Sequence, residues 1–405
     1  MGEAARPQSR FPGGIPDAAQ GADLAFYAIA DRYLDDSMRA YPSSATVVGH
    51  HVHDGRLEDL SAAGLGEKIG LARRYRAELS AIDPGRLSTS ARIDHRLVLN
   101  DVEAALFSLT ELKPHERNPQ SYVDLLGNST LYLTLLEPAS ALWPERLGAL
   151  LSRMQQIPDL LRSAKTNLRN PPRVATEMVL DTHAGNISFF EKTAPPLFAR
   201  APALREALVQ ENSRVIQALK EFQEWLLRDL LPRSNGDWRL GRDLWTRKLR
   251  HTLQSGLSPE EILRRAQEHL DADRRLMLEV ALPLHQALHP GPRHAETGDD
   301  LVNRVVREVL DDVCSRHSTR ESLFRDTLRA IDRIKAFIRE RGLITLPPDR
   351  DNFVVEPTPG FLDGVAVAFF NPPPILEPDL KKSFWISSVP RGGSPAKDRA
   401  AEESF

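Results

Sequence analysis

Apolar residues recur at spacings of three and four along the chain as far as about Leu343. This period places them on one face of a helix. It predicts helices over residues 24–38, 65–82, 90–112, 144–168, 173–192, 204–230, 258–288, 301–313 and 321–341. The predicted fold class is therefore mainly α, with long antiparallel helices.

Local signals mark several helix boundaries. The run Ser258-Pro259-Glu260-Glu261 has the pattern of a capping box, with a hydroxyl cap, a proline at the first helical position and an acid at the third. Gly342 is expected to end the last long helix, because glycine readily adopts the left-handed conformation of a C-cap. Pro158 and Pro283 lie inside predicted helices, where we expect a kink or a break.

The pattern changes after about Leu343. Residues 352–356 and 365–370 are short β-branched and aromatic runs bounded by proline and glycine, which predicts a small β element near the C-terminus. Residues 394–405 have the pattern of a helix start without a C-cap. We therefore expect a disordered tail over 1–21, a helical domain over 22–343, and over 344–405 a strand-rich segment with a helix stub that begins an incomplete, catalytic-type subdomain.

Composition and charge exclude several classes of protein. The 41% hydrophobic and 27% charged residues are typical of a globular protein, and the net charge of −3 argues against a nucleic-acid partner. No apolar run approaches the roughly 18 residues that a membrane span needs. Residues 1–21 lack the apolar core of a signal peptide, so we expect a cytoplasmic location. The single cysteine, Cys314, excludes an internal disulfide.

Three histidines near the end of one predicted helix have a spacing that zinc sites use. His285 and His289 are four residues apart, and His294 follows a Pro-Gly-Pro turn. However, Gln286 stands where a zinc peptidase has its glutamate general base. We interpret the three as surface histidines and assign no metal ligand.

A second group of histidines follows Gly49. His51 and His53 could share one face of an extended segment, which makes them candidates for lining a cleft. A structural role in the turn is the alternative.

Other polar groups give weaker signals. Glu177 and Asp181 share a helical face, which we interpret as solvated, and His183 faces elsewhere. Ser394 and Lys397 match a Ser-x-x-Lys pattern whose companion motifs are missing. No complete catalytic constellation is present, and we assign no catalytic residue.

Several segments, in order and over nearly the whole chain from about Leu24, resemble the bacterial family called domain of unknown function 885. The segments are Tyr41-Pro42-Ser43-Ser44-Ala45-Thr46 with Gly49-His50-His51, Leu57-Glu58-Asp59-Leu60-Ser61, Arg92-Ile93-Asp94, Glu116-Arg117-Asn118-Pro119 with Tyr122, Asn167-Leu168-Arg169-Asn170-Pro171-Pro172, Thr358-Pro359-Gly360-Phe361, and Phe369-Phe370-Asn371-Pro372-Pro373.

Members of that family resemble gluzincin-type zinc metallopeptidases, which are mainly helical with a cleft and a small sheet. The resemblance implies that this chain corresponds to the N-terminal part of such a fold. The His-Glu-x-x-His motif of these enzymes does not occur in the sequence, so no zinc ligand or general base is carried over. The resemblance implies zinc as a cofactor only together with a further C-terminal part.

In gluzincin-like folds the strand before the zinc helix forms one edge of the cleft and pairs with an extended substrate. By resemblance, this strand would be Val365, Ala366, Val367, Ala368 and Phe369, and the partner would be a peptide. An ordinary buried strand is the alternative.

The expected function is the helical scaffold of a zinc-dependent peptidase, catalytically inactive as it stands. Two alternatives stay open: a non-catalytic helical binding or scaffold protein, and a hydrolase that uses His51, His53 or the pair of His285 and His289. We also expect an exposed apolar patch in the C-terminal region, which includes Phe370 and Trp385, to promote self-association.

Overall fold

The computed structural model describes residues 21–135, 143–290, 297–315, 317–346, 353–358 and 367–387. The chain divides into two compact units, one of residues 1–254 with 373–380, the other of residues 255–372 with 381–405. The sequence pattern placed a boundary near residue 343, but that position lies inside the second unit. Residues 1–20 and 388–405, which carry the predicted tail and helix stub, lie outside the described ranges.

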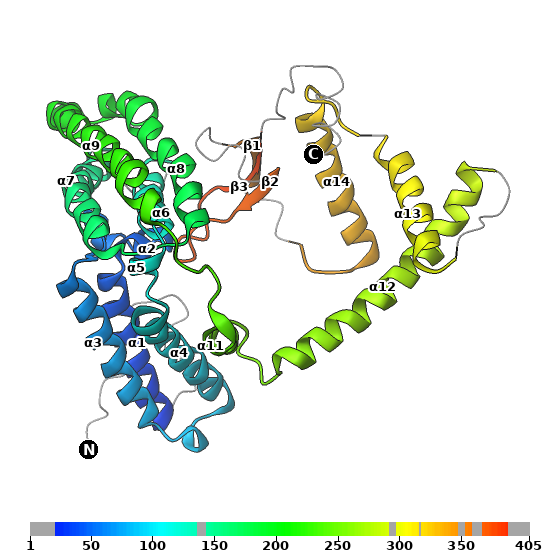
Figure 1. Cartoon of the computed structure of the whole chain (residues 1–405), viewed down its shortest axis with the longest axis horizontal. Helices are drawn as coiled ribbons and strands as arrows, with labels where there is room; N and C mark the ends of the chain where they lie inside the picture. Colours follow the sequence, from blue (N-terminus) through cyan, green and yellow to red (C-terminus); the bar gives the residue numbers. More distant parts are fainter. Residues whose placement is uncertain are drawn as a thin grey trace. The chain divides into compact units, whose positions relative to one another are not determined.

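The first unit is helical in its described part (Figure 1). Its α-helices are α1 (Ala22–Ala40), α2 (Pro42–Val47), α3 (Ala62–Ser80), α4 (Thr89–Phe107), α5 (Pro114–Arg117), α6 (Gln120–Leu135), α7 (Trp143–Asn167), α8 (Arg173–Ser188), α9 (Arg205–Trp225), α10 (Leu231–Arg233) and α11 (Gly241–Leu253). A short 3₁₀ turn, His51–His53, follows α2.

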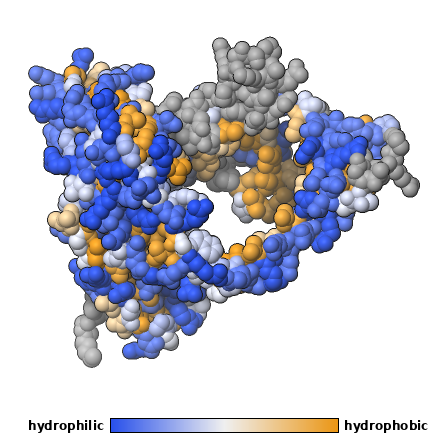
Figure 2. All heavy atoms as spheres, in the orientation of Figure 1, coloured by the Kyte–Doolittle hydropathy of each residue, from blue (hydrophilic) through white to orange (hydrophobic). Residues whose placement is uncertain are grey.

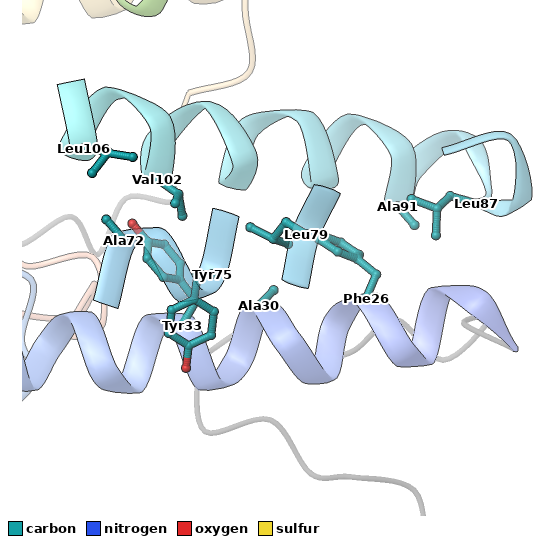
Figure 3. Packing of buried hydrophobic residues seen from close by; sticks show 10 residues of the cluster. All are labelled: Phe26, Ala30, Tyr33, Ala72, Tyr75, Leu79, Leu87, Ala91, Val102 and Leu106. Carbon is teal, nitrogen blue, oxygen red and sulfur yellow. The ribbon is translucent and has the colours of Figure 1, made fainter. Parts of the chain in front are cut away.

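Helices α1, α3 and α4 share one hydrophobic core (Figure 3). Its buried members are Phe26, Ala30, Tyr33, Ala72, Tyr75, Leu79, Leu87, Ala91, Val102 and Leu106. The phenols at its rim donate to carboxylates, with Tyr33 Oη 2.5 Å from Asp101 Oδ2 and Tyr75 Oη 2.7 Å from Asp36 Oδ2. Each large side chain that is fully removed from water contributes about 1.5–3 kcal/mol.

The predicted helix with an internal proline is continuous. Helix α7 runs from Trp143 to Asn167 through Pro158 and packs against α6 and α9. Apolar side chains on both sides of Pro158, such as Ile157 and Leu161, are buried. This packing outweighs the local cost of the hydrogen bond that proline cannot donate.

The second unit contains α12 (Pro259–Leu288), α13 (Gly298–Cys314) and α14 (Leu323–Arg341). Ser258 caps α12 as predicted, because its Oγ accepts from the Glu261 N–H at 3.1 Å. The Glu261 side chain does not form the second hydrogen bond of the expected capping box, because it pairs with Arg264 and Arg265. Gly342 ends α14 with φ of 59°.

Helices α12 and α13 run in the same direction. From one end of their contact to the other, Arg274 faces Asp299 and then His285 faces Glu308. Beneath these polar pairs a small apolar core forms around Ala281, Val305 and Val309. The helices therefore have a fixed register, in which residues four apart on α12 meet residues four apart on α13.

In the described ranges, three short strands form one mixed sheet, β1 (Phe353–Pro357), β2 (Ala368–Asn371) and β3 (Lys382–Ile386), in the order β1-β3-β2. Strand β3 pairs parallel with β1 and antiparallel with β2. The mainly helical fold with a small β element is thus confirmed, although the sequence pattern did not indicate the central strand β3.

Much of the apolar surface of the second unit is exposed. Apolar atoms of α12 and α14 are visible on the face shown in Figure 2. Among the described residues, no helix combines the length and apolar character needed to cross a membrane.

Candidate functional site

The predicted substrate strand forms an edge of the sheet. Ala368 and Phe369 lie in β2, Val367 directly precedes it, and Val365 and Ala366 lie outside the described residues. Among the described residues no strand lies beyond β2, because β3 separates it from β1. None of the side chains of β2 is fully buried. Within the described ranges, the strand therefore has one edge without a partner strand.

The hydrogen-bonding pattern shows which backbone groups face that edge. The Ser387 N–H donates to Val367 O at 2.9 Å, which makes these residues a hydrogen-bonded pair of the antiparallel ladder. Such pairs alternate with pairs that are not hydrogen-bonded. Ala368 and Phe370 therefore direct their N–H and C=O groups away from β3, toward the open edge.

A half-buried carboxylate holds β1 to β3. Glu356 accepts hydrogen bonds from Ser383 Oγ at 2.7 Å and Trp385 Nε1 at 3.1 Å. Partial burial raises the pKa of Glu356. These two hydrogen bonds and a third from Lys381 nevertheless keep that pKa below its usual value. The expectation that Trp385 is exposed is wrong: the residue is 8% exposed, because its ring packs edge-on against Phe369.

His51 is held between two carboxylates. Its Nδ1 lies 2.8 Å from Asp54 Oδ2 and its Nε2 lies 3.1 Å from Glu377 Oε2. The hydrogen bond to Asp54 and the one to Glu377 raise the pKa of His51 to about 9, against the effect of burial. At neutral pH the ring is therefore an imidazolium that donates from both nitrogens, and it cannot act as a general base.

His53 does not share a face with His51. The turn His51–His53 is helical rather than extended, so residues two apart diverge. The His53 ring instead lies against that of His50, with 5.7 Å between the ring centroids. Burial lowers the pKa of His53.

A polar chain leads from His51 into the interior. Asp54 Oδ1 accepts from Thr46 Oγ1 at 2.6 Å, and Thr46 Oγ1 accepts from Arg153 Nη2 at 2.6 Å. Arg153, on α7, is fully buried, and its Nε also donates to Arg56 O at 2.9 Å. Burial lowers its pKa to about 10, which leaves the guanidinium charged at neutral pH. This series of hydrogen bonds fastens the loop that follows α2 to helix α7.

Residues 373–380, which connect β2 to β3, close over this loop. The Leu376 N–H donates to Val48 O at 3.0 Å. Gly49 has φ of 90°, and a Cβ there would lie 3.1 Å from side-chain carbons of both Pro374 and Glu377. The position therefore requires glycine. The contacts hold residues 373–380 against the loop that contains His51, and we call this arrangement the clasp.

Two hollows of about 370 and 600 Å³ flank the neighbouring segment that contains Leu57 and Asp59. Neither His51 nor His53 is among the residues that line them. The predicted cleft histidines therefore do not face these hollows.

The pair of histidines on α12 has acidic partners that the sequence pattern did not indicate. His285 contacts Glu308, and His289 Nε2 lies 2.7 Å from Asp312 Oδ2. The interpretation of His285 as a surface residue is wrong, since it is only 4% exposed where α12 packs against α13. His294 lies outside the described residues.

The remaining candidates stay apart. His183 is buried and its Nε2 lies 2.9 Å from Leu219 O, whereas Glu177 is exposed and pairs with Arg173. Ser394 and Lys397 lie outside the described ranges. The sequence has one His-Glu pair, His115-Glu116, which lies on the short helix α5; Pro119 stands where a second zinc histidine would be.

The sequence matches a family described as "Bacterial protein of unknown function (DUF885)" over residues 42–402. The chain belongs to the DUF885 family. No curated protein of known function matches it. The description of the DUF885 family assigns no activity to its members.

A solved structure with a similar fold is available for comparison with this DUF885 chain. It is a candidate lipoprotein of unknown function from Shewanella oneidensis, with a TM-score of 0.72 and 20% sequence identity. The match covers 95% of this chain and 68% of that one. At this identity the likeness concerns the fold alone.

Proposed function

We propose that this chain is the helical scaffold of a zinc-dependent peptidase and that the outer edge of β2 holds an extended peptide. The observation that carries the proposal is the open edge of β2. There the backbone groups of Ala368 and Phe370 point away from β3, and an added strand would complete their hydrogen bonds.

Side chains beside the edge favour a peptide with apolar residues. Phe370 is 50% exposed, and its ring lies 6.3 Å from that of Phe353, nearly parallel to it. Val367 is also exposed. Alternate side chains of a bound strand would contact this apolar surface, while its backbone pairs with β2.

The sequence of this chain contains no His-Glu-x-x-His motif, so catalysis of peptide cleavage is not expected from its own residues. His51 does not replace that machinery, because its raised pKa keeps it protonated at neutral pH. A non-catalytic peptide-binding scaffold is the second candidate function, supported by the same open edge. An assay of metal-dependent peptide cleavage tests the remaining alternative, in which the chain is itself a hydrolase: we expect no cleavage from these 405 residues, since neither scaffold would cleave a peptide.

A panel of phage-displayed linear peptides, selected against the full chain, tests the β2 edge. Ala368→Pro removes an outward N–H without removing a bond to β3. We expect it to weaken a selected peptide about tenfold, the loss of about one hydrogen bond. Ala368→Val, which keeps the N–H, is the matched control and should bind normally.

Methylating backbone nitrogens of the selected peptide tests the same edge without altering the protein. Binding should fall at alternate positions only, because alternate residues of a paired strand face the partner strand. Failure to select any peptide, or equal binding by Ala368→Pro and Ala368→Val, would contradict the proposed edge.

A further inference from the structure

Helices α12 and α13 bring two imidazoles and two carboxylates together outside the β2 edge. The two histidines are His285 and His289, four residues apart on one side of the contact. Opposite them, Glu308 and Asp312 are four residues apart on α13. His285 contacts Glu308 and His289 contacts Asp312, and a ligand atom of Glu308 also lies within 4.8 Å of one on His289.

Donor atoms of three of the four side chains lie close enough to share one ion, and Asp312 contacts one of these three, His289. One ligand atom from each of His285, His289 and Glu308 lies within 4.8 Å of the other two. His289 Nε2 and Asp312 Oδ2 are 2.7 Å apart. Donor atoms about 2.1 Å from a tetrahedral zinc ion are roughly 3.4 Å from one another, so small side-chain rotations suffice.

We propose that these four side chains bind one divalent transition-metal ion of the Zn²⁺ class. Imidazole nitrogens together with carboxylate oxygens suit zinc, cobalt and nickel, whereas magnesium and calcium prefer oxygen alone. Four protein ligands make a closed, structural type of site rather than one that leaves a position for water. The ion would fasten α12 to α13.

One acid is poorly satisfied by its protein neighbours. Asp312 Oδ2 is shielded from solvent, and within the described residues it makes no well-directed hydrogen bond despite its short distance to His289. A buried carboxylate oxygen is costly to leave without a directed partner. A metal ion between the imidazole and this oxygen would satisfy both.

The surroundings orient the ligands. Arg304 Nε donates to Glu308 Oε1 at 3.1 Å, which leaves Oε2 directed at His285. Such contacts behind the ligating atoms fix their direction. The buried side chains of Ala281, Val305 and Val309 lie next to the site and hold the register of the two helices. The half-exposed His289 leaves a path for an ion from solvent.

Titration of the chelator-stripped full chain with ZnCl₂, followed by calorimetry, tests the site. We expect one ion per chain. His289→Gln and Glu308→Gln should each weaken binding at least tenfold, in line with loss of one ligand. His269→Gln is the matched control, since His269 is an exposed residue of the same helix and should not affect binding.

Nitrogen-detected NMR of the histidine rings provides a readout that does not depend on variants. On addition of one equivalent of ZnCl₂, the Nε2 resonances of His285 and His289 should shift, while that of His269 should not. Absence of stoichiometric binding would overturn the proposal. So would binding that His289→Gln and Glu308→Gln weaken no more than His269→Gln does, because the histidine–acid pairs would then be plain ion pairs.

Discussion

Helices α9 and α14 look alike as sequences and differ as parts of the fold. They have 21 and 19 residues, and both carry apolar side chains on one face and charged ones on the other. In α9 that face is buried, through Leu208, Val215, Leu219 and Phe222. In α14 no residue is buried, and Phe337 is 51% exposed.

The difference lies in what each helix packs against. Helix α9 lies between α7 and α8, and Asn212 Nδ2 donates to Phe190 O at 2.9 Å as a further anchor. In the described part of the second unit, α14 contacts β1, where Lys335 lies over the ring of Phe353. An amphipathic pattern thus fixes the helix and its apolar face, but the extent of burial depends on neighbours remote in sequence.

The largest difference is expected from matched phenylalanines. Phe222→Ala in α9 should lower the free energy of unfolding by about 3–5 kcal/mol, because the ring is fully buried against His183 and Trp225. Phe337→Ala in α14 should cost less than about 1 kcal/mol. Urea denaturation followed by circular dichroism measures both. Equal losses would show that α14 is as well packed as α9.

A buried charge gives the next largest effect. Arg153→Met should destabilise the first unit by about 3 kcal/mol, since Arg56 O and Ser129 O would lose their donor inside the protein. Arg162→Met on the same helix removes an exposed arginine and should cost less than about 0.5 kcal/mol. If the two variants unfold at the same urea concentration, the polar chain that ends at Arg153 does not stabilise the unit.

A smaller, pH-dependent effect is expected at the clasp. The folded-state pKa of His51, about 9, lies above its ordinary value of 6.5, so its contribution is complete below about pH 6.5 and is lost as the pH rises through 9. Because the side chain is 37% exposed, solvent reduces this contribution to about 1 kcal/mol. His51→Gln should therefore destabilise at about pH 6 and have little effect at about pH 10. A pH-independent difference would contradict the two-carboxylate geometry.

Helical periodicity predicted most long helices, because their apolar spacing and caps are local. Ser258 and Gly342 mark ends that the structure confirms. Helices α6 and α11 and strand β3 were missed. Strand β3 is a five-residue run whose partners are supplied by β1 and β2, which lie elsewhere in the sequence.

The candidate sites were harder to predict from the sequence than the helices, because their geometry depends on tertiary contacts. The spacing of His285 and His289 was visible, but their acidic partners lie on another helix whose direction the sequence does not reveal. A matching spacing of four between Glu308 and Asp312 was the available signal. Likewise, Glu377 meets His51 across 326 positions of sequence, so no local pattern could have indicated the clasp.

Native-state hydrogen exchange on the full chain tests the contrast between α9 and α14 most directly. The central amides of α9 should exchange only through large-scale unfolding, because their helix is buried on one face. Those of α14 should exchange through local opening at a free energy lower by several kcal/mol. Equal protection of the two helices would contradict the account, since it would mean that the exposed apolar face of α14 is covered in solution.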